Sequence, residues 1–184
     1  MSYIIFDLEA TCWENESDKK RTNEVIEIGA VKLSDTLDQI DEFSLFVKPT
    51  EHPELSKFCK KLTTIQQRDV DGAGLFSVVV PKFAKWAEGC ALYSWGYYDK
   101  LQLLREGSRK LLPHSYEKLN TTLFGHHSLK HEFADIKNIK PCGMEKALEL
   151  LGLPLVGTHH RGIADARNIT KIFIGVFDFL NLKS

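Results

Sequence analysis

The stretch Tyr3-Ile4-Ile5-Phe6-Asp7-Leu8-Glu9 opens the chain as a run of apolar residues that ends in two acids. Its apolar residues fall on both faces of an extended backbone, which predicts a strand over Tyr3–Leu8 in the centre of a sheet. Apolar runs at Val25–Leu33 and Phe43–Val47 predict two further strands. The link between these two, Ser34–Glu42, is polar and short enough for a hairpin loop, so the first three strands are expected to form an antiparallel meander.

Beyond this meander the apolar spacing changes to a helical period. A helix capped by Ser77 is predicted to run to about Glu88, with Pro81 in its first turn, where a missing N–H costs little. Residues at intervals of three and four carry this prediction: Leu75, Val79, Phe83, Trp86 and Cys90. The remaining predicted elements are a fourth strand at Ala91–Trp95 and helices at Asp99–Arg109, Met144–Leu151 and about Gly162–Leu180.

Residues 110–140 show little periodicity, and only a short strand near Ser128–Lys130 with a short helix after it is expected there. Strands first, followed by alternating strands and helices, predict an α/β layer architecture. The histidines His126, His127 and His131 suggest a zinc site, but no cysteine has the matching spacing, so we assign this group no role.

The composition is typical of a folded globular protein. The chain has 184 residues, 24 basic and 25 acidic side chains and a net charge of -1, which predicts a single domain over residues 1–184. A net charge near zero argues against the large basic surface of a DNA coat protein, but it is compatible with a nucleic-acid enzyme. The first residues have no basic segment of the kind that precedes a signal sequence, so a cytoplasmic location and no membrane partner are expected.

The four cysteines are far apart in the sequence and form no CxxC pair. In a chain of this size without an export signal, we expect them to be reduced rather than joined in disulfides. They are Cys12, Cys59, Cys90 and Cys142.

Two acids stand at the end of the first strand with one residue between them. Side chains alternate along a strand, so Asp7 and Glu9 project from the same face. Their mutual repulsion and burial raise their pKa unless a cation compensates, and Mg²⁺ or Mn²⁺ prefers such oxygen ligands. Taken alone, the pair is better explained as two solvated acids at a strand end, because Asp-x-Glu is a common pattern.

Two further acids occur where predicted helices begin. Asp99 follows the fourth strand, where α/β proteins place ligands, although by itself it fits a helix N-cap. Asp165 continues the apolar stripe of the last helix and therefore points inward, which requires a partner. His160 lies five residues before it and is suited to accepting a proton near neutral pH, although a structural histidine paired with a buried acid fits the pattern equally well.

Together these features resemble the DEDDh family of 3'-5' exonucleases, the DnaQ-like enzymes with a ribonuclease H-like fold. Phe6–Cys12 is similar to the first motif of that family. The residues of this motif are most similar to those of the Eri-like branch, whose members trim RNA 3' ends. Tyr98–Asp99 is similar to the second motif and His160–Asp165 to the third, His-x-x-x-x-Asp. Glu24–Ala30 resembles the family's second strand, and Phe58–Ile65 resembles the element that lines its nucleotide pocket.

The resemblance implies a mixed central sheet flanked by helices, with strands one to three antiparallel and later strands parallel to the first. It also implies two divalent ions, Mg²⁺ or Mn²⁺, about 4 Å apart, and in-line hydrolysis that releases nucleoside 5'-monophosphates. His160 would be the general base, and Glu9 would take part in catalysis as well as in metal binding; His159 is one residue too far from Asp165. The implied metal ligands are Asp7, Glu9, Asp99 and Asp165.

The resemblance also implies a site for the terminal nucleotide. The backbone around Glu9 and Ala10 would contact the 3' hydroxyl, and Phe58, Leu62 and Tyr98 would hold the base and sugar, with His160 close by. Packing of a short helix explains Phe58 and Leu62 equally well. Tyr98 stands where the Eri-like branch often has tryptophan, which leaves the details of stacking open.

The expected substrate is the 3' end of single-stranded nucleic acid, with RNA favoured over DNA. A proofreading exonuclease that acts on DNA with a polymerase, or a catalytically silent binding module of the same fold, remains an alternative. The silent module is disfavoured because all five catalytic residue types are present. The histidine spacing argues against a third alternative, a ribonuclease H-like endonuclease.

Overall fold

Six strands form one mixed sheet in this computed structural model, which describes residues 1–14 and 21–180. The order across the sheet is β4-β3-β2-β1-β5-β6. β1 and β2 pair in an antiparallel manner, as do β2 and β3, while β5 runs parallel to β1. The strands are β1 (Tyr3–Ala10), β2 (Val25–Leu33), β3 (Gln39–Lys48), β4 (Gly74–Leu75), β5 (Ala91–Ser94) and β6 (His127–Ser128).

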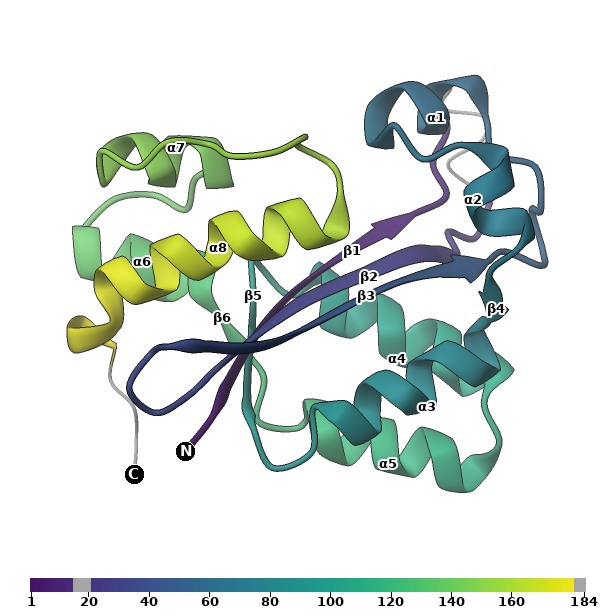
Figure 1. The fold of residues 1–184 in the computed structure, drawn as a ribbon, viewed down its shortest axis with the longest axis horizontal. Coiled ribbons are helices and arrows are strands. Elements are labelled where there is room, and N and C mark those ends of the chain that lie inside the picture. The colour runs from purple at the N-terminus through teal and green to yellow at the C-terminus, as the bar shows by residue number, and fades with distance from the viewer. Residues whose placement is uncertain (15–20, 181–184) are drawn as a thin grey trace.

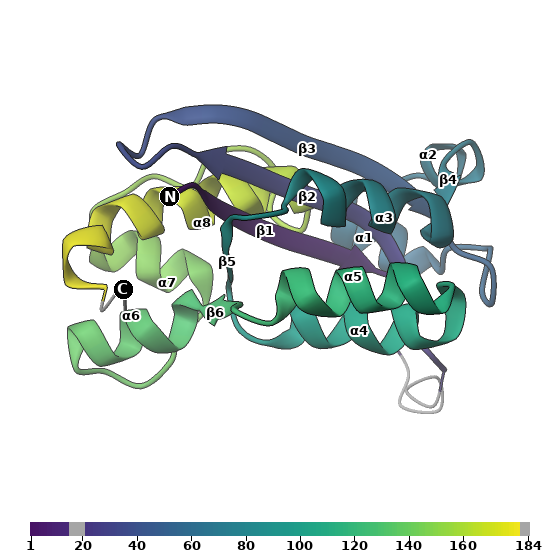
Figure 2. The ribbon, with the colours of Figure 1, turned by 90° about the horizontal axis from the view of Figure 1, so that it is seen from below.

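Helices cover both faces of this sheet (Figure 1). α3, α4 and α5 lie on one face, α6, α7 and α8 lie on the other, and α1 and α2 lie beyond the carboxyl end of β1 (Figures 1 and 2). The helices are α1 (Lys57–Thr63), α2 (Gln67–Asp71), α3 (Phe76–Trp86), α4 (Tyr98–Lys110), α5 (Pro113–Leu123), α6 (Leu129–Lys137), α7 (Met144–Leu150) and α8 (Gly162–Val176).

Side-chain alternation along β1 builds two separate cores. Ile4, Phe6 and Leu8 pack with α3, α4 and α5 in one apolar cluster. Tyr3 and Ile5 point the other way and pack with α6, α7 and α8 in a second cluster. A strand that is covered on both faces needs apolar residues at every position, which is the pattern at the start of β1.

The central strands of the predicted sheet are confirmed, whereas β3 is longer than predicted. The antiparallel meander of β1, β2 and β3 occurs as expected, and β2 has the predicted bounds. The fourth predicted strand is β5, which runs parallel to β1 as expected. β3 begins at Gln39 rather than Phe43, so the loop of the hairpin is shorter than predicted. The first residues of β3 are exposed, and an exposed strand tolerates polar side chains that hide its strand pattern.

The helix after β4 differs from the prediction at its start. Leu75 rather than Ser77 occupies the cap position, and Pro81 lies inside α3 instead of in its first turn. Val79 and Phe83 are buried as the periodicity predicts, whereas Leu75 is exposed at the end of β4 and Phe76 is buried in its place. Tertiary packing of this face therefore outweighs the local cap and proline signals.

The least periodic part of the sequence is nevertheless structured. α5 was not predicted; it begins with Pro113 in its first turn and buries only Leu119 and Leu123. The expected short strand and helix are present as β6 and α6, with the strand slightly earlier than predicted. α8 ends at Val176, where a 3₁₀ turn, Phe177–Phe179, takes over from the α-helix predicted to reach Leu180. Among the described residues, no helix has both the length and the apolar character needed to cross a membrane.

Candidate active site

A cavity of about 250 Å³ opens at the carboxyl end of β1. The strand order divides at β1, with β2 on one side and β5 on the other, and such a division leaves a crevice at the strand ends. Pairing between β1 and β5 ends at Ile5 and Tyr93, so the last residues of β1 border the crevice. The cavity is lined by Asp7, Leu8, Glu9, Trp95, Tyr98, Asp99, Met144, His159, His160, Asp165 and Ile169.

A larger cavity of about 650 Å³ lies at the other end of the same strands. Met1 and Ala91, at the amino ends of β1 and β5, line it together with residues of α5. The predicted catalytic residues line the smaller cavity instead, so we place the candidate active site there.

Asp7 and Glu9 reach the cavity because of the alternation along β1. Tyr3 and Ile5 face α8, and the next two residues of the same parity are these two acids. Glu9 is only 8% exposed, while Asp7 is partly buried. The predicted common face is therefore present, and it is the face covered by α8.

Asp99 enters the cavity from α4. It lies in the first turn of the helix, with Tyr97 in the cap position, so the alternative prediction of an Asp99 N-cap is wrong. The backbone N–H of Leu8 donates to Oδ1 of Asp99 over 3.1 Å. This bond ties the second motif directly to the strand that carries the first.

Ser94 and His126 form a polar support behind Asp99. Burial raises the pKa of Asp99 to about 6, against hydrogen bonds from the Ser94 hydroxyl and the Leu8 N–H that lower it. Oγ of Ser94 also lies 2.8 Å from Nε2 of His126, and burial lowers the pKa of that histidine to about 4. The sequence prediction missed both residues, because no local pattern shows that a serine at a strand end meets a histidine 32 positions later.

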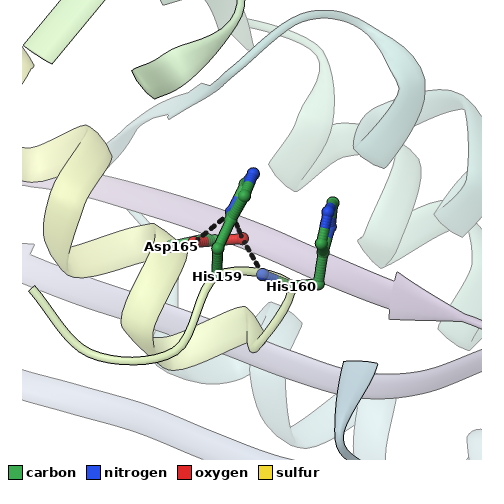
Figure 3. Close-up of side chains that lie close together, drawn as sticks. All are labelled: His159, His160 and Asp165. Atoms are coloured by element: carbon green, nitrogen blue, oxygen red, sulfur yellow. Dashed lines mark hydrogen bonds and ion pairs between the residues drawn. The ribbon is translucent and has the colours of Figure 1, made fainter. Parts of the chain in front are cut away.

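Asp165 is held by the two histidines that precede α8 (Figure 3). Nδ1 of His159 lies 3.0 Å from both carboxylate oxygens of Asp165. The backbone N–H of His160 donates to Oδ2 of Asp165 over 2.9 Å. The two imidazole rings stack with their centroids 4.0 Å apart, and both residues line the cavity.

The backbone at His160 has φ of 62°, in the left-handed region that non-glycine residues rarely adopt. Burial lowers the pKa of His160, and the neighbouring His159 adds to this effect, so the ring is neutral at pH 7. A neutral imidazole is the form that accepts a proton. His159 takes the direct side-chain contact with Asp165, and the assignment of His160 as general base stays a prediction.

The loop before α8 is anchored to β2. Glu27 is almost fully buried and accepts hydrogen bonds from Nε of Arg161 over 3.1 Å and from the Gly162 N–H over 3.0 Å. Glu27 lies opposite Glu9 in the β1–β2 register. We did not predict this anchor, although an acid on the same face of the neighbouring strand is the signal that could have revealed it.

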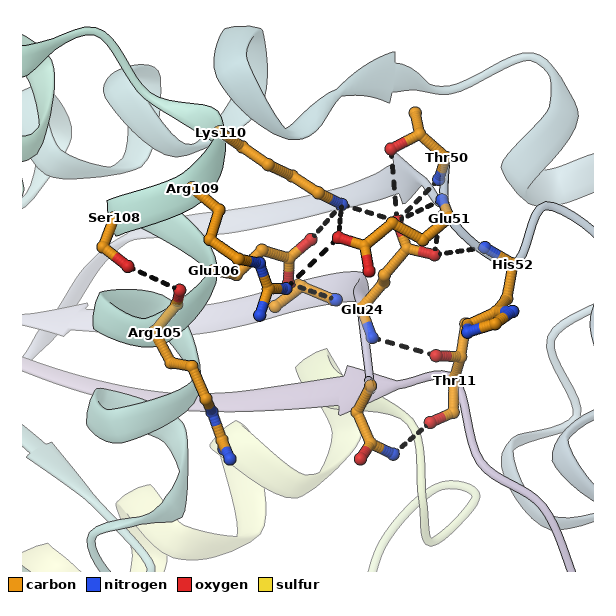
Figure 4. Close-up of polar contacts among 12 residues, drawn as sticks. Thr11, Glu24, Thr50, Glu51, His52, Arg105, Glu106, Ser108, Arg109 and Lys110 are labelled. Carbon is orange, nitrogen blue, oxygen red and sulfur yellow. Dashed lines mark hydrogen bonds and ion pairs between the residues drawn. The ribbon is translucent and has the colours of Figure 1, made fainter. Parts of the chain in front are cut away.

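α4 is fixed at its far end by a second buried network (Figure 4). Nζ of Lys110 donates to Glu24 over 2.5 Å and to Glu106 over 2.7 Å. Glu24 also accepts backbone N–H bonds from residues 50–52. The helix that carries Asp99 is therefore attached to the start of β2 as well as to β1.

The acids of the cavity perturb one another strongly. Burial and the nearby Asp99, Glu9 and Asp165 raise the pKa of Asp7 well above its usual range. Burial, Asp165 and Glu27 are the main causes that raise the pKa of Glu9 to about 8. A cluster of carboxylates with raised pKa values is stabilised by a cation.

The donor set fits a hard divalent metal ion. Asp7, Glu9 and Asp165 each offer a carboxylate oxygen, and these atoms lie within 4.8 Å of one another. His159, His160 and Asp165 form a second group within the same limit. Oxygen-rich sites of this kind suit Mg²⁺ and Mn²⁺.

The predicted nucleotide-binding residues divide into two groups. Tyr98 lines the cavity and is 49% exposed. Phe58 and Leu62 lie on α1, beyond the end of β1 and outside the residues that line the cavity, and Ala10 contacts α1 through its carbonyl oxygen, which accepts from Cys59 Sγ. Contact of these residues with a nucleotide stays a prediction.

The sequence profile of the exonuclease family RNase_T matches residues 4–173. The chain belongs to this exonuclease family. The nuclease domain of 3'hExo, described as a DEDDh family member bound to rAMP, superimposes with a TM-score of 0.85 at 27% identity, over 97% of this chain and 92% of that domain. The resemblance to DEDDh exonucleases, the ribonuclease H-like fold and the 3'-5' exonuclease class are thereby confirmed.

Two curated relatives are similar over most of this exonuclease domain. ERI1 exoribonuclease 2 of Danio rerio is 34% identical over 90% of this chain, which corresponds to 33% of the relative. A PolC-type DNA polymerase III of Caldanaerobacter subterraneus is 32% identical over 97% of this chain and 12% of the polymerase. This chain therefore spans a third or less of the length of both relatives.

Proposed function

We propose that this exonuclease domain acts on single-stranded RNA and removes nucleoside 5'-monophosphates from the 3' end. The observation that carries the proposal is the meeting of four acids from three separate segments in one cavity: Asp7, Glu9, Asp99 and Asp165. Exoribonuclease names among the relatives, and the rAMP bound by 3'hExo, favour RNA.

The four acids would hold two divalent metal ions, Mg²⁺ or Mn²⁺. Bound there, such ions lower the pKa of an attacking water and stabilise the leaving 3' oxygen. In this proposal the neutral ring of His160 accepts the proton of that water. The buried anchor between Glu27 and Arg161 keeps the histidine loop beside β1 while this happens.

The substrate strand would enter with its 3' end toward β1. Backbone groups of Glu9 and Ala10 would contact the terminal hydroxyl, which restricts cleavage to the last nucleotide. Tyr98, exposed at the cavity, and Phe58 and Leu62 on α1 would hold the last base and sugar by apolar contact.

The test is stepwise degradation of matched 5'-labelled RNA and DNA strands with Mg²⁺, Mn²⁺ or EDTA. The native chain is expected to shorten RNA from the 3' end only when metal is present. Asp7→Asn should abolish this activity, while Asp135→Asn, at an exposed position on α6, should retain it. A folded native chain that shortens neither strand with either metal would contradict the proposal and favour the silent binding module.

DNA is the second candidate substrate, because the PolC-type polymerase is similar over nearly the whole chain. The same experiment separates the two, since the ratio of RNA to DNA degradation rates measures the preference directly. A rate ratio in favour of DNA would replace the exoribonuclease by a proofreading-type exonuclease with the same acids.

A further inference from the structure

Two cysteines that are far apart in the sequence meet at the active-site end of β1. Cys12 follows the acids of β1, and Cys59 lies on α1, where it is fully buried. Their thiols are hydrogen-bonded to each other, and both belong to the apolar cluster between β2, α1 and α2. All four cysteines are free thiols in the structure.

The backbones around the two thiols are also joined. Oγ of Ser56 donates to the Cys12 carbonyl over 2.6 Å and accepts from the Cys59 N–H over 2.9 Å. Sγ of Cys59 accepts from the Cys12 N–H and lies 3.8 Å from the Ala10 carbonyl. One serine and two backbone contacts therefore hold the cysteines side by side, and partly exposed Cys12 is the one that solvent reaches.

We propose that Cys12 and Cys59 form an oxidative modification site, at which a hydroperoxide converts the two thiols into a disulfide and thereby lowers the activity of the adjacent active site. The disulfide itself follows from the geometry of the pair, whereas its effect on activity rests on the proposed function.

The chemistry balances with a hydroperoxide as the oxidant. Cys12 Sγ attacks the peroxide oxygen, the O–O bond breaks, and the Cys12 thiol proton goes to the leaving oxygen, which yields a sulfenic acid on Cys12 and an alcohol or water. Cys59 Sγ then attacks the sulfenic sulfur, the S–S bond forms, and the sulfenic oxygen leaves as water. In total two thiols and one hydroperoxide give one disulfide, one alcohol or water, and one further water.

The electrostatics favour Cys59 as the nucleophile of the second step. The hydrogen bond from Cys12 lowers the pKa of Cys59 to about 7, so Cys59 carries a large thiolate fraction at neutral pH. The same bond, together with burial, raises the pKa of Cys12. Cys59 is thus placed to act as the thiolate that attacks the sulfenic sulfur once the more exposed Cys12 has reacted.

Closing the disulfide changes the active site because of where the pair lies. An S–S bond is about 2.05 Å long, shorter than a hydrogen bond between thiols, so Cys12 and α1 must approach each other. The β1–β2 register already shifts between Glu9 and Ala10. We expect the movement to reach Glu9 and Ala10, and a displacement of about 1 Å in an active site can cost on the order of a hundredfold in rate.

The test treats the full chain with hydrogen peroxide, blocks free thiols, and measures intact mass and linked peptides. A loss of about 2 Da and a peptide joining Cys12 to Cys59 are expected, both reversed by dithiothreitol and both absent in Cys12→Ser. The control is the double variant Cys90→Ser and Cys142→Ser, which should oxidise like the native chain. A disulfide through Cys90 or Cys142, or no disulfide at all in folded protein, overturns the site.

Activity on RNA is measured on the same samples, each variant against its own reduced form. The oxidised native chain is expected to lose at least about tenfold and to recover with dithiothreitol, whereas Cys12→Ser loses nothing. A disulfide that leaves activity unchanged overturns the regulatory part. A reduced chain that is inactive but still forms the disulfide shows instead that the proposed function has failed while the modification site stands.

Discussion

At the scale of single residues, the acids of this site depend on particular hydrogen-bond donors. Asp99 has the Leu8 N–H and the Ser94 hydroxyl, and Ser94 is in turn fixed by His126. Asp165 has a backbone N–H and an imidazole. Such contacts orient a ligand before any cation binds, so they belong to the site as the groups that position its acids.

Ser94→Ala is expected to weaken Mn²⁺ binding about tenfold, because groups that orient a metal ligand typically contribute 10- to 100-fold in affinity. The variant removes one donor to Asp99 and leaves Nε2 of buried His126 without its serine partner. Isothermal titration with Mn²⁺ measures the effect, and Ser108→Ala, at an exposed position on α4, is the matched control. Equal affinity in the folded Ser94 variant would show that Asp99 is oriented by Leu8 alone.

Glu24→Gln tests the buried network of Figure 4. Although burial raises the pKa of Glu24, hydrogen bonds from Lys110 and from the backbone of residues 50–52 lower it from 4.5 to about 2. Because the folded state prefers the charged form, the stabilisation is complete above pH 4.5 and is lost as the pH falls toward 2. From this shift, native and variant chains are expected to differ by about 3 kcal/mol in free energy of unfolding at pH 7.

Urea unfolding at several pH values between 7 and 2 measures this difference. It should shrink steadily below about pH 4.5, and Glu117→Gln, at an exposed position on α5, should show no such difference at any pH. A gap that stays constant with pH would mean that packing rather than charge makes Glu24 important.

At the scale of elements, the site exists because α8 lies unusually close to β2. A Cβ on Gly29 would lie 2.0 Å from the backbone nitrogen of Ile163 and 2.1 Å from the carbonyl carbon of Gly162. These are the first residues of α8, and Asp165 follows in the same turn. Because Gly29 has no Cβ, α8 can approach β2 closely, and this approach sets how deep Asp165 reaches into the cavity.

Gly29→Ala is expected to push the start of α8 away from the sheet. The clash involves backbone atoms that cannot rotate aside, and overpacking of this kind costs about 1–3 kcal/mol of stability. Mn²⁺ affinity should fall as well, because Asp165 moves with the helix. Thermal unfolding and titration with Mn²⁺ measure the two effects.

Gly72→Ala provides the matched control, because the nearest atom to its added Cβ would be 4.0 Å away. This variant should bind Mn²⁺ like the native chain. Native-like metal affinity in Gly29→Ala would contradict the assigned role of the close approach between α8 and β2.

At the scale of the whole molecule, the fold gathers like charges that oppose its own stability. Burial and four neighbouring carboxylates raise the pKa of Asp7. Divalent ions that bind only the folded chain relieve this repulsion and shift the folding equilibrium. The molecule is therefore expected to gain stability from the ions that its reaction requires.

Mn²⁺ at a hundred times its dissociation constant is expected to raise the free energy of unfolding of the native chain by about 2.7 kcal/mol. Asp7→Asn should lose most of this gain, yet in EDTA it should melt above the native chain, because one buried acid has been removed. Calorimetry in EDTA and in Mn²⁺ measures both. A native melting temperature that does not respond to Mn²⁺ would argue against a built metal site.

The prediction that residues 1–184 form one domain stays a prediction, as does the cytoplasmic location. The two apolar clusters do show that α3 to α8 pack against the two faces of one sheet. Residues 4–173 match one family, which agrees with a single exonuclease unit.

The sequence alone determined what depends on local periodicity. Alternation along Tyr3–Glu9 put Asp7 and Glu9 on one face, and the helical stripe of α8 turned Asp165 inward, because periods of two and 3.6 residues are properties of the backbone itself. The antiparallel pairing of the first three strands followed from the same patterns together with a short connection, whereas the family resemblance implied the later strands parallel to the first. The motif spacing then identified the family before any contact was known.

Only the tertiary structure decided which distant residues meet. α5 has few buried residues, and the start of β3 is exposed, so neither shows a clear period in sequence. The pairing of Ser94 with His126, of Glu27 with Arg161 and of Cys12 with Cys59 has no local signature either. Such contacts arise only when separate elements pack. The spacing of neighbouring residues predicts periodicity within one element, but it does not predict which elements pack together.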